Sequence, residues 1–192
     1  KTADKALKYP AAGFVYLPSG AVYIADSGNH QVRFLLPDGR LLVAAGTGKP
    51  GLVNGASNVA QFKQPGAVVI DSVRRVLYVA DSGNHVIRKV TLQGTVTTFA
   101  GSGRPEDRDG IGAAAAFKSP AGLAIDADGN LYVADGGNDK IKRVSPDGVV
   151  TTIAGAGRPG LANGPALQAL FKKPQGIAVD ERGTVIVADT GN

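Results

Sequence analysis

An aspartate recurs along this chain at nearly constant spacing, and its carboxylate could bind a metal or transfer a proton. The four copies are 55, 54 and 54 residues apart, and each begins an Asp-x-Gly-Asn motif: Asp26, Asp81, Asp135 and Asp189. An aspartate before a tight turn commonly accepts hydrogen bonds from backbone N–H groups. Gly and Asn tolerate the positive φ angles found in such turns. We therefore interpret these aspartates, together with Asn29, Asn84 and Asn138, as structural turn residues.

The two histidines of the chain occupy equivalent positions directly after these motifs. His30 and His85 are matched in the third copy by Asp139. A His/His/Asp set is a conceivable metal site on residue type alone. Equivalent positions in successive repeats should diverge in space, so we predict turn or surface residues there. The sequence therefore predicts no metal site and no cofactor.

Composition removes several classes of function. The chain has 192 residues, 43% of them hydrophobic, and contains 27 Gly, 11 Pro and no Cys or Met. Such a chain can fold around a core and has many turns, but it has no disulfide, thiol nucleophile or cysteine metal site. We find no apolar stretch of membrane-spanning length and no signal peptide, and the missing initiator Met suggests a processed chain or a fragment.

Further markers keep the same register as the aspartates. Each unit opens with a proline, its apolar part closes with Ala-Gly, and a phenylalanine comes three residues before the next proline; these phenylalanines are Phe62, Phe117 and Phe171. Several independent markers in one register indicate an internal repeat. The sequence predicts one domain over 1–192, with units at about 10–64, 65–119 and 120–173 and a partial unit at 174–192.

The third unit shows the expected structure most clearly. Short apolar or alternating runs at 122–126, 131–134, 140–144 and 149–154 are separated by turn residues rich in Gly, Asp and Asn. Four short strands joined by tight turns form an antiparallel meander. A radial stack of such sheets predicts an all-β fold, a β-propeller with four-stranded blades. One short helix is expected in each linker between units.

The third strand of each unit is expected to be more polar and to lie near the rim. It carries a basic residue seven positions after each of the first three recurring aspartates: Arg33, Arg88 and Lys142. We expect the stems of these side chains to cover apolar surface. Their charged heads should reach solvent or pair with a neighbouring acid.

Two segments resemble a known repeat family. Leu77–Val90, with its Asn84-His85 pair, and Leu131–Val144 are similar to the NHL repeat, in its longer bacterial form. The resemblance implies a β-propeller, usually six-bladed, that serves as a binding platform for protein or RNA. Related six-bladed propellers include metal-dependent lactonases and an amidating lyase. The bacterial form also slightly favours an extracytoplasmic location.

Three and a half blades cannot close a six-bladed ring. An open ring exposes an unpaired strand edge and an apolar sheet face. We therefore expect a fragment of a longer chain, or closure by a second copy or by another polypeptide.

The long linkers and the Asp-x-Gly-Asn turns should share one face of a propeller. The linkers at 47–65, 102–120 and 156–174 contain three acids and eight basic residues: Lys49, Lys63, Arg104, Arg108, Lys118, Arg158, Lys172 and Lys173. This excess motivates the hypothesis that the face binds an acidic protein surface, an anionic glycan or nucleic acid. The alternative is that these side chains only keep long loops soluble.

An enzymatic site would need carboxylates, amides or histidines that converge on a metal in the central channel. The predicted inner strands at 13–17, 66–70, 122–125 and 176–179 contain no acid. The sequence therefore favours a non-catalytic binding or scaffold module, with protein–protein interaction as its leading function. A metal-dependent hydrolase, lactonase or lyase whose site lies in other blades stays open as an alternative.

Overall fold

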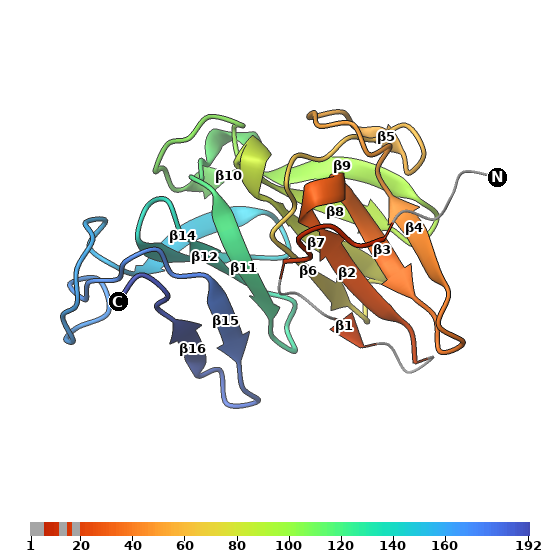
Figure 1. Cartoon of the computed structure of the whole chain (residues 1–192). Coiled ribbons are helices and arrows are strands. Elements are labelled where there is room, and N and C mark those ends of the chain that lie inside the picture. The colour runs from red at the N-terminus through yellow and green to blue at the C-terminus, as the bar shows by residue number, and fades with distance from the viewer. Residues whose placement is uncertain (1–5, 12–14, 17–19) are drawn as a thin grey trace.

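The chain folds into antiparallel sheets that stand side by side like the leaves of a fan (Figure 1). The computed structural model describes residues 6–11, 15–16 and 20–192. The first sheet has the order β1-β2-β3-β4, with strands β1 (Val15–Tyr16), β2 (Val22–Asp26), β3 (Gln31–Leu35) and β4 (Leu41–Ala45). The rest of the inner strand predicted at 13–17 lies outside the described residues.

The second and third sheets contain a fifth, outermost strand in addition to the predicted four. The second comprises β6 (Ala67–Asp71), β7 (Val76–Asp81), β8 (Val86–Thr91), β9 (Thr95–Ala100) and the added β5 (Gly55–Ala56). The third comprises β11 (Pro120–Ile125), β12 (Leu131–Asp135), β13 (Lys140–Val144), β14 (Val149–Ala154) and the added β10 (Gly110–Ile111). Each added strand comes from the preceding linker, which folds back and pairs with the edge of the sheet. The linkers thereby cover edges that would otherwise be open.

The last sheet consists of two strands, β15 (Gly176–Val179) and β16 (Val185–Ala188). Three short 3-10 helices complete the described elements: η1 (Ser27–Asn29), η2 (Ser82–Asn84) and η3 (Gly112–Ala114). The first two are the recurring turns, and the third lies in the linker 102–120. The described linkers 47–65 and 156–174 contain turns and no helix, so the expected short helix is found in one linker of the three. No helix within the described residues is long and apolar enough to cross a membrane.

The innermost strands of neighbouring sheets contact one another, β11 lying between β6 and β15. The sheets do not close into a ring (Figure 1). The all-β class, the antiparallel meander and the open arrangement are therefore as the sequence predicts.

Phenylalanines from the linkers fill the space between adjacent sheets. Phe62 belongs to a cluster with Val32 of the first sheet and Val79 of the second, and Phe117 joins the second sheet to the third. Both rings are fully buried. Gly46 is needed beside Phe62, because its φ is +106° and a Cβ there would lie 3.1 Å from the ring. The Phe and Ala-Gly markers of the repeat are thus explained by packing between blades.

Each recurring aspartate binds the linker that leads into its own blade. In the second blade, Asp81 Oδ1 accepts the backbone N–H of Lys63 at 2.7 Å, while Oδ2 accepts Asn84 Nδ2 at 2.8 Å and Arg88 NH1 at 2.9 Å. The first two bonds recur in the other three units, at 2.6–2.9 Å, around Asp26, Asp135 and Asp189. The carboxylate therefore fastens a linker 17 or 18 residues away in sequence, and we call this arrangement the aspartate clamp.

The glycine of each motif is required by the close approach of the same linker. Gly83 N–H donates to the carbonyl oxygen of Lys63 at 2.8 Å, and a Cβ on Gly83 would lie 2.7 Å from that oxygen. Positive φ is found instead at the following His85, at 60°. The sequence-based reason given for Gly and Asn was therefore wrong, because steric room and side-chain hydrogen bonding, not a left-handed backbone, select them.

The residue after each motif bridges to the next blade. His30 Nδ1 accepts the backbone N–H of Gln64, and His85 Nδ1 accepts that of Ser119, both at 3.1 Å. Asp139 Oδ1 accepts the backbone N–H of Lys173 at 2.8 Å in the third blade. The His/His/Asp set is thus spread over three blade boundaries, where each member serves as a hydrogen-bond acceptor.

Removal of a buried clamp carboxylate should destabilise the fold. We expect Asp81→Ala to lower the free energy of unfolding by about 3–5 kcal/mol, because it leaves Arg88 buried without its ionic partner. Urea denaturation measures this change. The matched control is Asp189→Ala, which removes the same clamp where the aspartate is only half-buried. Equal losses for the two variants would contradict the role given to burial.

The histidine bridge should make stability sensitive to acid. Burial, together with Lys63 and Lys118, lowers the pKa of His85 below its usual 6.5. The unfolded chain therefore takes up a proton first, and the stability contributed by neutral His85 is present above about pH 6.5 and is lost as pH falls toward the folded-state pKa.

We compare wild type with His85→Asn, because Asn also tolerates positive φ and can accept the Ser119 N–H without titrating. The melting temperature of wild type should fall more than that of the variant between pH 7.5 and pH 5. Parallel melting curves over this range would contradict the prediction.

Candidate functional site

The linkers and the recurring turns form one end of the fan, which we call the linker face. It comprises linkers 47–65, 102–120 and 156–174, the segment 6–10 before the first blade, and the turns at 27–30, 82–85, 136–139 and 190–192. In Figure 1, the linker that carries β5 lies at the top, while the β3–β4 and β15–β16 hairpins end below. This face contains the basic residues that the sequence singled out.

The third-strand cations are buried, contrary to the expected exposure near the rim. Arg33, Arg88 and Lys142 are 1%, 0% and 0% exposed. Arg88 NH1 lies 2.9 Å from Asp81, and Arg33 NH1 lies 3.7 Å from Asp26. Pairing with a neighbouring acid was expected and is observed, but contact of the heads with solvent is not. The linker covers Arg88, which donates to the carbonyl oxygen of Val53 at 2.8 Å.

The third blade balances its buried charges differently. Lys142 Nζ lies 2.8 Å from Asp107 and 2.9 Å from Asp109, both in the linker. Asp109 has the position that Asn54 has in the second blade, where Arg88 NH2 donates to Asn54 Oδ1 at 2.9 Å. Burial raises the pKa of Asp135 to about 7, against the hydrogen bonds from Asn138 and the Lys118 N–H and the charge of Lys142, which lower it. These two linker acids are thus engaged with a buried cation.

The eight basic residues predicted for binding are all exposed on the linker face. Arg108 is partly engaged within its own linker, because its Nε donates to the carbonyl oxygen of Ala114 at 2.7 Å and its NH2 lies 3.5 Å from Glu106. Sequence reasoning missed Lys8, which is equivalent to Lys63, because only the linkers between complete units were compared. A comparison of the position two residues before each opening proline would have revealed it, because that position is lysine in every unit.

The recurring turn aspartates offset less of the positive charge of the linker face than their number suggests. The carboxylates of Asp26, Asp81 and Asp135 are 0% exposed. They lie under the linkers, where they meet the N–H groups and cations already described. The exposed cations therefore determine much of the charge that an approaching partner meets.

Exposed apolar side chains accompany the cations. Those that are described in the linkers and in the first segment include Leu7, Tyr9, Leu52, Val53, Val59, Ile111, Leu161 and Leu167. Leu161 is 76% exposed and lies three residues after Arg158. Exposed apolar groups rimmed by polar residues are typical of surfaces that contact other proteins.

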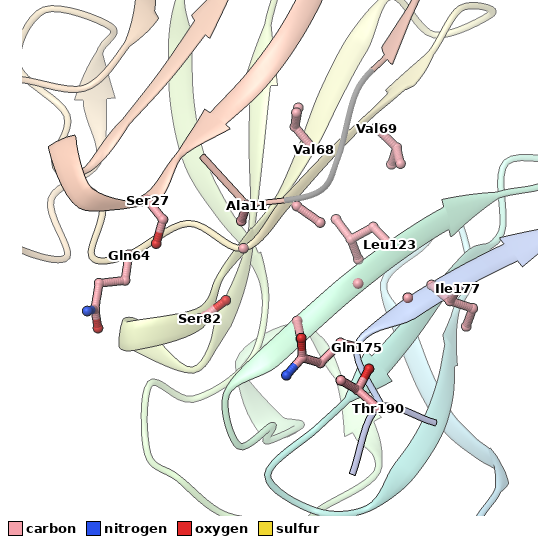
Figure 2. Close-up of a pocket in the computed structure, with 15 residues that line it drawn as sticks. Ala11, Ser27, Gln64, Val68, Val69, Ser82, Leu123, Gln175, Ile177 and Thr190 are labelled. Atoms are coloured by element: carbon pink, nitrogen blue, oxygen red, sulfur yellow. The ribbon is translucent and has the colours of Figure 1, made fainter. Parts of the chain in front are cut away.

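A hollow of about 690 Å³ lies along the innermost strands. Figure 2 shows the polar residues Ser27, Gln64, Ser82, Gln175 and Thr190 around it, with apolar side chains from β6, β11 and β15. Its described lining contains no charged side chain. The Ser82 hydroxyl donates to the carbonyl oxygen of Pro120, so it joins two blades.

Metal-binding side chains are not gathered in the described part of the chain. No group of three or more His, Cys, Asp or Glu residues lies together there. The carboxylate of Asp81 and the imidazoles of His30 and His85 accept backbone N–H groups of the linkers instead.

Family models match nearly the whole chain. The "SMP-30/Gluconolactonase/LRE-like region" matches residues 16–171, and the NHL repeat matches residues 171–192. The resemblance to the NHL repeat is thereby confirmed.

Two curated relatives are much longer proteins. SUPPRESSOR OF QUENCHING 1, chloroplastic, from Arabidopsis thaliana is 33% identical over 89% of this chain, which covers 17% of that protein. NHL repeat-containing protein 2 from Bos taurus is 28% identical over 96% of this chain, which covers 29% of it. The chain thus spans less than a third of either relative.

Solved structures share the fold. A protein of unknown function from Bacteroides thetaiotaomicron has a TM-score of 0.76 and 24% identity, over 93% of this chain and 44% of its own. A streptogramin B lyase has a TM-score of 0.65 and 14% identity, over 95% of this chain and 49% of its own. At these identities the likeness shows the β-propeller fold alone. The chain therefore belongs to the SMP-30/gluconolactonase/LRE-like family of β-propellers and ends in an NHL repeat.

Proposed function

We propose that this propeller segment is a non-catalytic recognition or scaffold module that binds a protein through its linker face. The observation that carries this proposal is the composition of that face, where exposed apolar residues lie among exposed cations on linkers held by the aspartate clamps. Apolar contacts supply binding energy, and charges steer the encounter and select the partner.

The recurring aspartates support a structural role over a catalytic one. Their side chains already accept two or three hydrogen bonds each, as Asp81 does from Lys63, Asn84 and Arg88. A carboxylate so engaged would have to break the link to its linker before it could bind a metal or a substrate. The hollow along the inner strands has an uncharged lining where the structure describes it, and this part likewise offers no general acid or base.

Site-specific photo-crosslinking in the cells from which the sequence comes tests this proposal. A photoreactive phenylalanine replaces Leu52 or Leu161 on the linker face in one set of proteins. In the control set it replaces Val73 or Leu92, which are also exposed but lie in the hairpin turns at the opposite end. We expect a discrete cross-linked protein from the first set alone.

Equal cross-linking from both ends, or none from the linker face, would contradict the choice of surface. Metal-dependent hydrolysis of gluconolactone by the purified protein would contradict its non-catalytic nature. These two outcomes are separate, so each part of the proposal can fail by itself.

A further inference from the structure

A lysine occupies the same place on the linker face in all four units. It lies two residues before each opening proline, and all four copies are exposed: Lys8, Lys63, Lys118 and Lys172. The residue in each case is the one that the aspartate clamp holds. The backbone of these lysines is therefore among the best-fixed parts of the face.

Two hydrogen bonds hold each lysine backbone. The N–H of Lys118 donates to Asp135 Oδ1 at 2.8 Å, and its carbonyl oxygen accepts the N–H of Gly137, also at 2.8 Å. The same pair of bonds, at 2.7–2.9 Å, fixes Lys8, Lys63 and Lys172. By contrast, the N–H of Lys49 donates to Thr47 and that of Arg104 to Ser102, within their own linkers.

The first part of each lysine side chain packs on the glycine of the clamp. A Cβ built on Gly137 would lie 2.6 Å from Lys118 Cγ, and one on Gly83 would lie 2.7 Å from Lys63 Cγ. The stem is thus directed by the turn, while the ammonium group remains in solvent. Such a side chain loses less rotamer entropy on binding than one on an unconstrained loop.

The spacing of the four lysines is fixed by a chain of hydrogen bonds that crosses the blades. The residue after Lys63 is Gln64, which donates to His30 of the preceding blade, and the residue after Lys118 is Ser119, which donates to His85. Lys173 donates to Asp139 in the same way. Consecutive lysines therefore stand one blade apart on a continuous hydrogen-bonded rim.

The fold does not require lysine at these positions. The clamp uses only the backbone N–H and C=O, which every residue except proline offers, and the end of the side chain is exposed. Packing constrains only the first part of these side chains, so four identical charged ends indicate a shared role for the ammonium groups. Fixed cations at regular spacing suit an anionic surface with several charges.

We propose that these four lysines form the charge-reading part of the protein-binding face and engage a partner surface rich in Asp and Glu. This inference rests on the proposed function, to which it adds the chemistry of the partner. Nucleic acid is less suited, because single strands are bound with aromatic platforms. Phe62 and Phe117 are buried here, and Tyr9 is the exposed aromatic ring of the described linker face.

The test uses poly-L-glutamate as the probe and a quadruple variant, Lys8→Gln, Lys63→Gln, Lys118→Gln and Lys172→Gln. The control variant removes the same net charge elsewhere, through Arg40→Gln, Arg75→Gln, Arg143→Gln and Arg182→Gln. We expect the quadruple lysine variant to lose about tenfold in affinity and to show a shallower salt dependence, and the control to lose less than about twofold.

Equal losses in the two variants would overturn the proposal, because net charge alone would then explain binding. Tighter binding of poly-uridylate than of poly-L-glutamate, abolished in the lysine variant, would overturn it in favour of nucleic acid. Melting temperatures should match wild type, since the clamps keep their backbone groups.

Cross-linking from Leu52 separates this inference from the proposed function. Loss of the cross-linked protein in the lysine variant supports both. An unchanged yield in that variant refutes the lysine array and leaves the binding face intact. Absence of the product in wild type refutes the proposed function itself.

Discussion

The structure depends on one buried interaction, the bond between a carboxylate at the end of a blade's second strand and the backbone of the linker that precedes that blade. The linker has little regular structure, so its polar backbone needs partners when it packs on the sheets. Asp81 supplies a partner for Lys63, and Asn84 reaches both Asp81 and the carbonyl oxygen of Gly51. With the linker fixed, Phe62 enters the gap between blades, and β5 pairs with the sheet edge.

A buried carboxylate needs compensation, and the blades supply it in two ways. The second blade places Arg88 against Asp81 and uses a neutral Asn54 in the linker. The third has Lys142, which lies against Asp107 and Asp109 in the linker, while burial raises the pKa of Asp135 to about 7. Arginine can serve several partners at once through its fork of donors, whereas lysine is a point charge. Changes at positions 88 and 54 are therefore physically coupled, as are those at 142 and 109.

The repeat register was enough to predict the all-β meander and the turns, because four strands and their Gly, Asp and Asn residues are local signals. Burial of Arg88 could not be predicted, since a basic residue in an alternating strand normally faces solvent. It is covered by two linker residues that lie more than thirty positions earlier in the sequence, Val53 and Asn54. The bridges from His30 and His85 escaped prediction for the same reason, as their partners lie 34 residues away.

The aspartate clamp allows the residues that stabilise the fold to differ from the residues that contact a partner. In each recurring unit an Asp and a Gly hold the backbone of another residue, and an Asn holds the Asp, so the fold fixes the position of that residue without fixing the end of its side chain. A repeat built in this way can change what it presents at Lys8, Lys63, Lys118 and Lys172 without loss of packing. The adjoining Gln64, Ser119 and Lys173 show this freedom, because three different residues there make the same backbone bond to the previous blade. Lysine, by contrast, occurs in all four units. Because these side chains are exposed on the linker face, the choice of lysine affects what a partner contacts there.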